Sequence, residues 1–126
     1  GEFAQQYADS MAKITGYTIA ITDKDQVIAS AGDSKKELMS KKISSELEEA
    51  VEERSTILAT KEDKNFILIT NSEIDFVQEV ISPIISEGDI IGSVAILSKD
   101  TKEKFGETQV QLTETAASFL GSQMEQ

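Results

Sequence analysis

Residues 76–97 read FVQEVISPIISEGDIIGSVAIL and contain the most strand-like pattern in the chain. Two runs rich in Val and Ile flank the turn-forming triplet Glu87-Gly88-Asp89, which predicts a long antiparallel hairpin with Gly88 at positive φ. Pro83 has no amide proton to donate to a ladder, so we expect it at a bulge or on an unpaired side of its strand. Gly92 indicates a bulge or the close approach of another backbone segment. An antiparallel sheet built around this hairpin is therefore the centre of the predicted fold.

The first part of the chain predicts a helix followed by a second, shorter hairpin. Apolar residues recur at helical spacing through residues 1–15, and Gly16 is typical of a helix C-terminus. Residues 17–22 and 27–31 are short β-rich runs separated by the turn-forming sequence Asp23-Lys24-Asp25-Gln26. Two carboxylates in such a turn, with no further ligand at a recognisable spacing, indicate a turn rather than a metal site.

Shorter elements complete the pattern. Ser-x-x-Glu spacings, which are typical of capping boxes, predict short helices that start at Ser34 and at Ser44-Ser45. Residues 56–59 resemble a strand, whereas residues 66–69 fit either a short strand or a packed loop. A last helix is predicted over residues 105–124 from its helical apolar spacing. The order of helix, hairpin, short helices, further strands and helix predicts an α+β domain with an antiparallel sheet.

The residue types that the chain lacks exclude several classes of function. Its 126 residues contain no His, Cys or Trp, which excludes Ser-His-Asp triads, thiolate nucleophiles, iron–sulfur clusters and imidazole sites for zinc or haem. The chain has 12 Lys and Arg against 23 Asp and Glu, a formal charge of −11, which opposes direct binding to nucleic acid or an anionic membrane. No run reaches the roughly 18 apolar residues that span a bilayer. We therefore expect a binding or structural module, without catalytic residues, metal or cofactor, rather than an enzyme.

Two short motifs have chemical interpretations, and each also has a structural one. The sequence Ser10-Met11-Ala12-Lys13 has the S-x-x-K spacing of β-lactamases, but no S-D-N or K-T-G motif accompanies it. Ser34, Lys35 and Lys36 place two cations at a helix start, which is a feature of anion-binding sites. An exposed helix cap with two solvated lysines explains the same three residues.

Both terminal helices carry more apolar surface than one sheet face can cover. Their apolar residues span arcs of roughly 180°, whereas a helix resting on one surface needs roughly 100°. We therefore expect the two helices to lie side by side on the sheet and to contact the same helices of a second copy, with Ala117 and Gly121 permitting close approach. A monomer with well-buried helices, or a first helix that packs on a further domain, stays open. The expected interface residues are Phe3, Tyr7, Met11, Ile14, Val110, Ala117, Leu120 and Met124.

Five stretches carry a family resemblance: Asp23-Lys24-Asp25, residues 28–36, 82–92 (SPIISEGDIIG), 98–100 and 114–126 (ETAASFLGSQMEQ). Together they are similar to the C-terminal GAF domain of AbrB-type sporulation transcription regulators. The resemblance implies one GAF-like domain over residues 1–126 with a sheet of about six strands, terminal helices (1–15 and 105–125) on one face and short helices over the other. It also implies a cytoplasmic protein of the forespore that contacts DNA only through a separate N-terminal domain, and that forms a homodimer or a higher oligomer.

The same resemblance implies a small-molecule pocket between the sheet and the short helices. The cyclic-nucleotide signature of GAF domains is absent, and the missing Cys and His exclude bilin, haem and thiol chemistry, so no known ligand or activity transfers. An unidentified small molecule is one expectation; a ligand-free oligomerisation or protein-interaction module is the alternative, and a PAS-like or enzymatic domain is a third. A cavity of roughly 300 Å³ or more favours sensing. The expected pocket residues are Ile19, Ile21, Ile43, Leu47, Val80 and Ser82, with Ser34, Lys35 and Lys36 at the rim.

Overall fold

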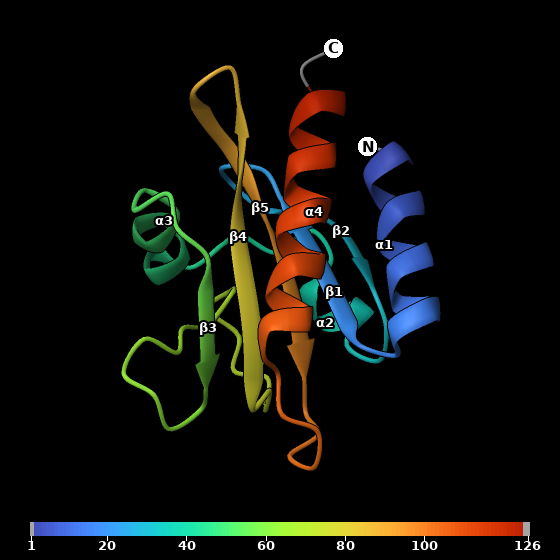
Figure 1. Ribbon diagram of the computed structural model, residues 1–126, viewed down its shortest axis with the longest axis vertical. Helices are drawn as coiled ribbons and strands as arrows, with labels where there is room; N and C mark the ends of the chain where they lie inside the picture. The colour runs from blue at the N-terminus through green and yellow to red at the C-terminus, as the bar shows by residue number, and fades with distance from the viewer. Residues whose placement is uncertain (1, 125–126) are drawn as a thin grey trace.

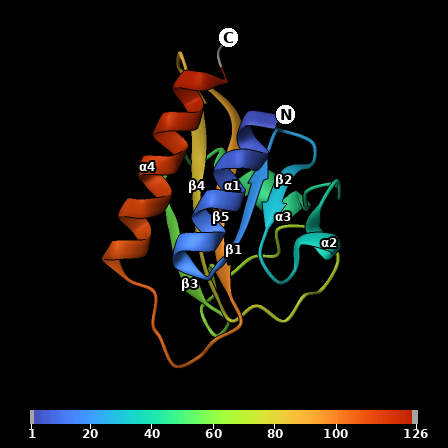
Figure 2. The same ribbon diagram turned by 90° about the vertical axis from the view of Figure 1, so that its right-hand side faces the viewer.

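Residues 2–124 are described by the computed structural model, and they build one antiparallel sheet with helices on both faces. Helices α1 and α4 lie on one face, whereas α2 and α3 lie on the other (Figure 1, Figure 2). The strand order is β2-β1-β5-β4-β3, and all neighbouring strands are antiparallel. The elements are α1 (Glu2–Thr15), β1 (Thr18–Thr22), β2 (Val27–Ala31), α2 (Lys35–Leu38), α3 (Ser45–Val51), β3 (Ile57–Thr60), β4 (Gln78–Ser86), β5 (Asp89–Ser98) and α4 (Glu107–Gln123).

The predicted hairpin is confirmed as β4 and β5, which form the middle of the sheet. Its turn residues Glu87 and Gly88 both have positive φ, 52° and 89°, as a two-residue hairpin turn requires. Strand β3 pairs only with the first part of β4, from Gln78 to Ile81, so Pro83 lies where β4 has no strand partner on that side. Gly92 permits the close approach that the sequence indicated, because a Cβ there would lie 1.9 Å from the carbonyl oxygen of Thr22 on β1.

The terminal helices agree with their predicted positions to within a few residues. Helix α1 ends at Thr15, and the Gly16 amide donates to the carbonyl of Ala12. Helix α4 begins two residues later than expected, because the amide of Phe105 is bound by the side chain of Gln78. Residues 1, 125 and 126, which the predicted boundaries include, lie outside the described part of the chain.

The sheet has five strands in the described residues, where about six were expected. The difference lies in the segment between β3 and β4, residues 61–77, which we call the covering segment. Its residues 66–69 form a packed loop: the amides of Ile67 and Leu68 donate to the side chains of Glu79 and Glu46, and only Thr70 makes an isolated bridge, to Ile43. Backbone groups bound by side chains are not available for strand pairing.

The sheet separates two apolar cores. Side chains alternate along each strand, so neighbouring residues face opposite layers. The core under α1 and α4 contains Ile19, Ile21, Val80, Ile84, Val94, Ile96 and Leu120, among others. The core under α2, α3 and the covering segment contains Leu38, Ile43, Leu47, Ile69, Phe76, Ile81 and Leu97, among others. No helix within residues 2–124 is long and apolar enough to cross a membrane.

Candidate functional site

The most prominent surface feature is an apolar groove between α1 and α4, with a volume of about 490 Å³. Phe3 and Tyr7 of α1 reach across to Phe119 of α4, with ring centroids 5.6 and 5.4 Å apart. Aromatic pairs at such separations contribute beyond the area they bury. The other groove residues are Gln6, Ser10, Met11, Ile14, Thr15 and Leu112.

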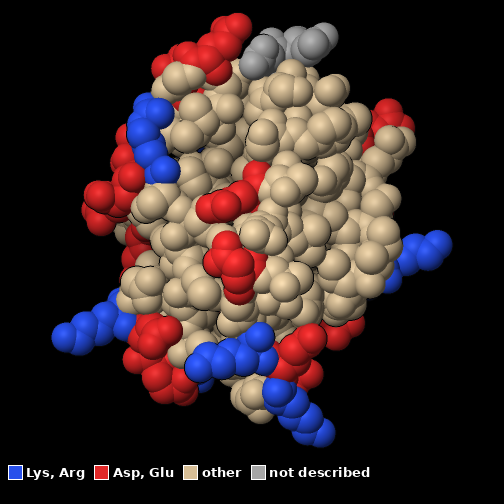
Figure 3. All heavy atoms as spheres, viewed as in Figure 1, with Lys and Arg blue, Asp and Glu red and all other residues tan. Residues whose placement is uncertain are grey.

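Large apolar side chains remain exposed around this groove. Ile14 is 84% exposed, Phe3 43% and Phe119 41%. In Figure 3, acidic side chains gather on the left, where α3 lies in Figure 1, whereas most of the right-hand part, over α4 and α1, is uncharged. An exposed apolar surface of this kind is typical of an interaction site.

The expected interface residues divide into two groups. Phe3 and Ile14 are exposed and Tyr7, Val110 and Met124 are half-buried, so all five can contact a partner. Ala117 and Leu120 are buried within the chain, which corrects their expected position, whereas Met11 is buried but also lines the groove. These three fill the core between their helix and the sheet. The sequence reasoning missed Phe119, although its type and its place on the apolar arc were visible.

Gly121 has a different role from the expected one. A Cβ at this position would lie 2.5 Å from the carbonyl oxygen of Ile85 on β4. Together with the buried Ala117, Gly121 therefore brings α4 close to its own sheet rather than to a second copy.

The expected pocket residues do not form one pocket. Ile43 and Leu47 lie in the core under α3, whereas Ile19, Ile21 and Val80 lie on the opposite side of the sheet, under α1 and α4. Ser82 is also on that opposite side, in a groove with Glu114 and Ala117 of α4. The prediction was wrong for these four residues because strand parity decides the face that a side chain joins.

The space between α3 and the sheet is almost filled. The cavity next to Ile43, Leu47 and Val51 has a volume of about 80 Å³, well below the roughly 300 Å³ typical of a ligand pocket. A buried hydrogen bond of 2.7 Å between the hydroxyls of Thr22 and Ser93 closes its sheet side. In this conformation, the space between α3 and the sheet is therefore filled by a packed core.

The expected polar rim is also dispersed. Lys35 and Lys36 are exposed, but Ser34 is buried and its hydroxyl has no hydrogen-bond partner within residues 2–124. Ser34 precedes α2 without capping it, so the predicted capping box does not form. At Asp23 the turn interpretation holds, because one carboxylate oxygen accepts the amides of Asp25 and Gln26.

We therefore expect substitution by alanine to change the free energy of unfolding differently at Ser34 and at Ser44. Ser44 caps α3 by accepting the amide of Leu47, and its hydroxyl donates to the carbonyl of Leu68. We expect Ser44→Ala to lower the free energy of unfolding by about 1–2 kcal/mol. Ser34→Ala removes an unpaired buried hydroxyl, and should leave the stability equal or higher. Urea unfolding measures both; equal losses for the two variants would contradict these assignments.

Glu79 is the one buried carboxyl group in the described residues, and the sequence reasoning did not single it out. Its residue is 1% exposed, on β4 beneath the covering segment. Burial raises its pKa to about 8; the hydrogen bond from the Ile67 amide opposes this shift, and the nearby carboxylate of Glu46 adds to it. The sequence contained one signal for this buried group, because Glu79 is a carboxyl group within the apolar run that forms β4.

Comparisons with known proteins agree on both family and fold. Residues 1–125 match the family described as stage V sporulation protein T C-terminal, transcription factor. The chain is 40% identical over 126 residues to stage V sporulation protein T of Bacillus subtilis (strain 168), which covers all of this chain and 69% of that protein.

Solved structures with low sequence identity share the fold alone. A methyl-accepting chemotaxis protein (residues 122 to 287) has a TM-score of 0.77 at 16% identity, covering 96% of this chain and 85% of its own. The cofactor-binding GAF domain of the nutrient sensor CodY from Clostridium difficile has a TM-score of 0.72 at 13% identity, covering 95% and 83%. A type II free methionine-R-sulfoxide reductase from Thermoplasma acidophilum has a TM-score of 0.74 at 13% identity, covering 96% and 89%. The expected GAF-like α+β fold is confirmed.

Proposed function

Because the chain belongs to the family of stage V sporulation protein T C-terminal transcription-factor domains, we propose that it regulates transcription by pairing two copies of its protein through the α1/α4 groove. The observation that carries this proposal is the exposed apolar surface around the groove, where Ile14 and Phe119 lie on helices from opposite ends of the chain. When two copies meet on this face, α1 and α4 of each form a four-helix contact.

The position of α1 links this contact to DNA binding. In the family, the domain is the C-terminal part of a transcription factor. A DNA-binding segment that precedes α1 is then attached to a helix of the interface, so pairing sets the separation of two such segments. Because the formal charge of −11 opposes contact between this domain and DNA, that segment makes the DNA contact on this proposal. On this proposal the domain acts in the cytoplasm and carries out no catalytic step.

The connection that follows α3 is in direct contact with the interface helix α4. The connection from α3 to β3 carries Thr56, whose hydroxyl donates to the Glu114 carboxylate of α4 at 2.7 Å and shares a 2.9 Å hydrogen bond with Ser82. Arg54, in the same connection, donates to the carbonyl of Gly88 at the tip of the β4–β5 hairpin. A displacement of α3 therefore acts on α4 through a short chain of contacts. The small cavity under α3 favours an oligomerisation module over a preformed sensor pocket.

Sedimentation equilibrium tests the pairing. We expect the parent domain to form dimers at micromolar concentration, and Ile14→Asp to weaken the dimer by at least about tenfold, because it places a charge in a desolvated apolar contact. Ile14 is so exposed that the substitution should not affect folding. Leu58→Asp is the matched control, since Leu58 is 42% exposed on the distant edge strand β3. A monomeric parent, or equal effects of the two substitutions, would refute the proposal.

A further inference from the structure

The two edge strands of the sheet lack the usual protection against the addition of a further strand. Strands β2 (VIASA) and β3 (ILAT) lie at the two ends of the strand order, and neither contains a charged residue or a proline. An edge strand presents unpaired amide and carbonyl groups on its outer side, and charges or prolines commonly keep other chains from pairing with them. Closure of these two edges therefore depends on other parts of the protein.

Two edge positions are closed by the segment that follows the strand in the chain. On β3, the Asp63 carboxylate accepts the Thr60 amide at 2.8 Å, and the Asp63 amide donates to the Thr60 carbonyl at 2.9 Å. On β2, the amide and the carbonyl of Val27 bind the backbone of Lys41 and Ser40. At both positions the outer backbone groups are therefore unavailable to another strand.

Ser30 of β2 is closed in a different way, by a side chain of helix α1. The carboxamide oxygen of Gln5 accepts the Ser30 amide at 3.1 Å, and its nitrogen donates to the Ser30 carbonyl at 2.7 Å. These are the two bonds that a neighbouring antiparallel strand would exchange with this residue. The Gln5 side chain therefore occupies the place of an added strand.

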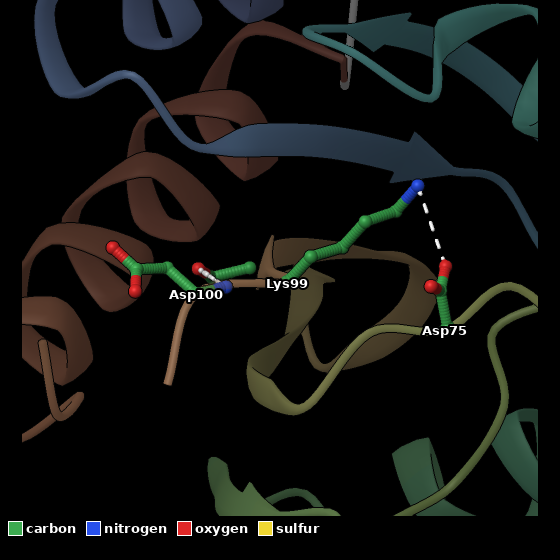
Figure 4. Close-up of polar contacts among 4 residues, drawn as sticks. Asp75, Lys99 and Asp100 are labelled. Carbon is green, nitrogen blue, oxygen red and sulfur yellow. Dashed lines mark hydrogen bonds and ion pairs between the residues drawn. The ribbon is translucent and has the colours of Figure 1, made fainter. Parts of the chain in front are cut away.

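The same two bonds are the polar attachment of α1 to the sheet. Helix α1 lies over β1 and β2 (Figure 2). Within residues 2–124, no other α1 side chain makes a hydrogen bond to a strand, and the single ion pair joins Lys99, just after β5, to Asp75 (Figure 4). The residues that α1 buries are Ala4, Ala8 and Met11. The docked position of α1 and the closed edge at Ser30 therefore depend on each other.

Helix α1 also presents half of the pairing surface. Phe3 and Tyr7 lie about 200° around the helix from Gln5, so they point to α4 while Gln5 points to β2. Gln5 itself does not line the groove. A displacement of α1 that opens the edge at Ser30 therefore also dismantles the α1/α4 groove.

We propose that Gln5 decides how two copies of the chain meet. While its side chain binds Ser30, the β2 edge is closed and the groove is assembled for helical pairing. When α1 lifts away, a second copy adds its own β2 at Ser30, with the two strands antiparallel about a twofold axis. The uncharged sequence of β2 suits this pairing, because no like charges meet across the two strands. The helical alternative rests on the function proposed above, whereas the closure of the edge does not.

Hydrogen exchange and isotope-filtered nuclear magnetic resonance of the Gln5→Met domain test this inference. Methionine keeps the length of the side chain but cannot bind the Ser30 backbone. We expect the Ser30 amide to exchange at least about tenfold faster than in the parent. We also expect contacts between labelled and unlabelled copies at residues 27–31, which the parent should not show. Gln111→Met is the matched control and should behave as the parent does, since Gln111 is exposed on α4 and does not line the groove.

A second substitution separates an opened edge from a general loss of structure. Adding Ile28→Lys to the Gln5→Met domain places a charge on β2, where Ile28 is half-buried. It should remove the contacts at residues 27–31 while the Ser30 amide keeps its fast exchange.

Three results would overturn the inference. They are unchanged exchange of the Ser30 amide in Gln5→Met, the absence of contacts at residues 27–31 in that variant, and contacts there that persist in the double variant. A monomeric parent would refute pairing through the groove, but the same three measurements would still decide the role of Gln5.

Discussion

The free energy of unfolding should fall by about 4 kcal/mol as the pH is raised from about 5 to about 9, through Glu79 alone. In the unfolded chain this carboxyl group ionises near its ordinary pKa of 4.5, whereas burial raises its folded pKa to about 8. The unfolded state therefore releases its proton first, and each further pH unit between these values favours unfolding. The contribution of Glu79 to stability is complete below pH 4.5 and is lost as the pH rises through 8.

The Glu79→Gln variant isolates this contribution. Its amide oxygen can still accept the Ile67 amide, but it does not titrate, so the difference in stability between parent and variant should follow the titration of Glu79. The comparison is necessary because the formal charge of −11 also destabilises the fold as the pH rises. Urea unfolding at a series of pH values measures the difference, with Glu49→Gln as a control that keeps the parent's slope. Parallel curves for the parent and Glu79→Gln would show that Glu79 ionises normally in the folded protein.

Substitution of Gly92 by Ala should destabilise the fold by about 3 kcal/mol or more. The added Cβ would lie 1.9 Å from the carbonyl oxygen of Thr22 and 3.1 Å from the Cα of Asp23. Both are backbone atoms at the end of β1, so relief requires β1 and β5 to separate where they pair. A side-chain rotation cannot remove the clash.

Gly106→Ala is the matched control, because no atom lies within 4 Å of a Cβ at that position and φ is not positive there. Urea unfolding should therefore show a much smaller effect for this variant. Equal stability of Gly92→Ala and Gly106→Ala would contradict the close approach of the Thr22 carbonyl oxygen to Gly92.

Local patterns in the sequence predicted much of the fold. The β4–β5 hairpin was predictable because its apolar runs and its turn are adjacent in the chain. Helix α1 was predictable from its spacing and its stop at Gly16. Helix α3 was predictable from the Ser-x-x-Glu spacing at Ser45, although the residue that caps it is Ser44. For residues 66–69 the sequence left a short strand and a packed loop open, because the partners of the Ile67 and Leu68 amides are the distant side chains of Glu79 and Glu46.

The candidate sites were predicted less well, because they depend on how elements face one another. The apolar arcs correctly identified α1 and α4 as helices with excess apolar surface. The rotation of each helix on the sheet places Leu120 inward and Phe119 outward, and the pattern does not contain this information. The same holds for the strands, where a shift of one residue decides whether Ile19 or Ala20 faces the terminal helices.

If two copies pair through the α1/α4 groove, intermolecular nuclear Overhauser effects should detect the contact between them. The sample is a one-to-one mixture of isotope-labelled and unlabelled domain, in which filtered spectra report contacts between copies only. We predict contacts that join the Ile14 methyl groups and the Phe119 ring of one copy to α1 and α4 of the other. Contacts confined to Leu58 and the β3 edge, or no contacts at concentrations well above micromolar, would show that the copies do not pair through this groove.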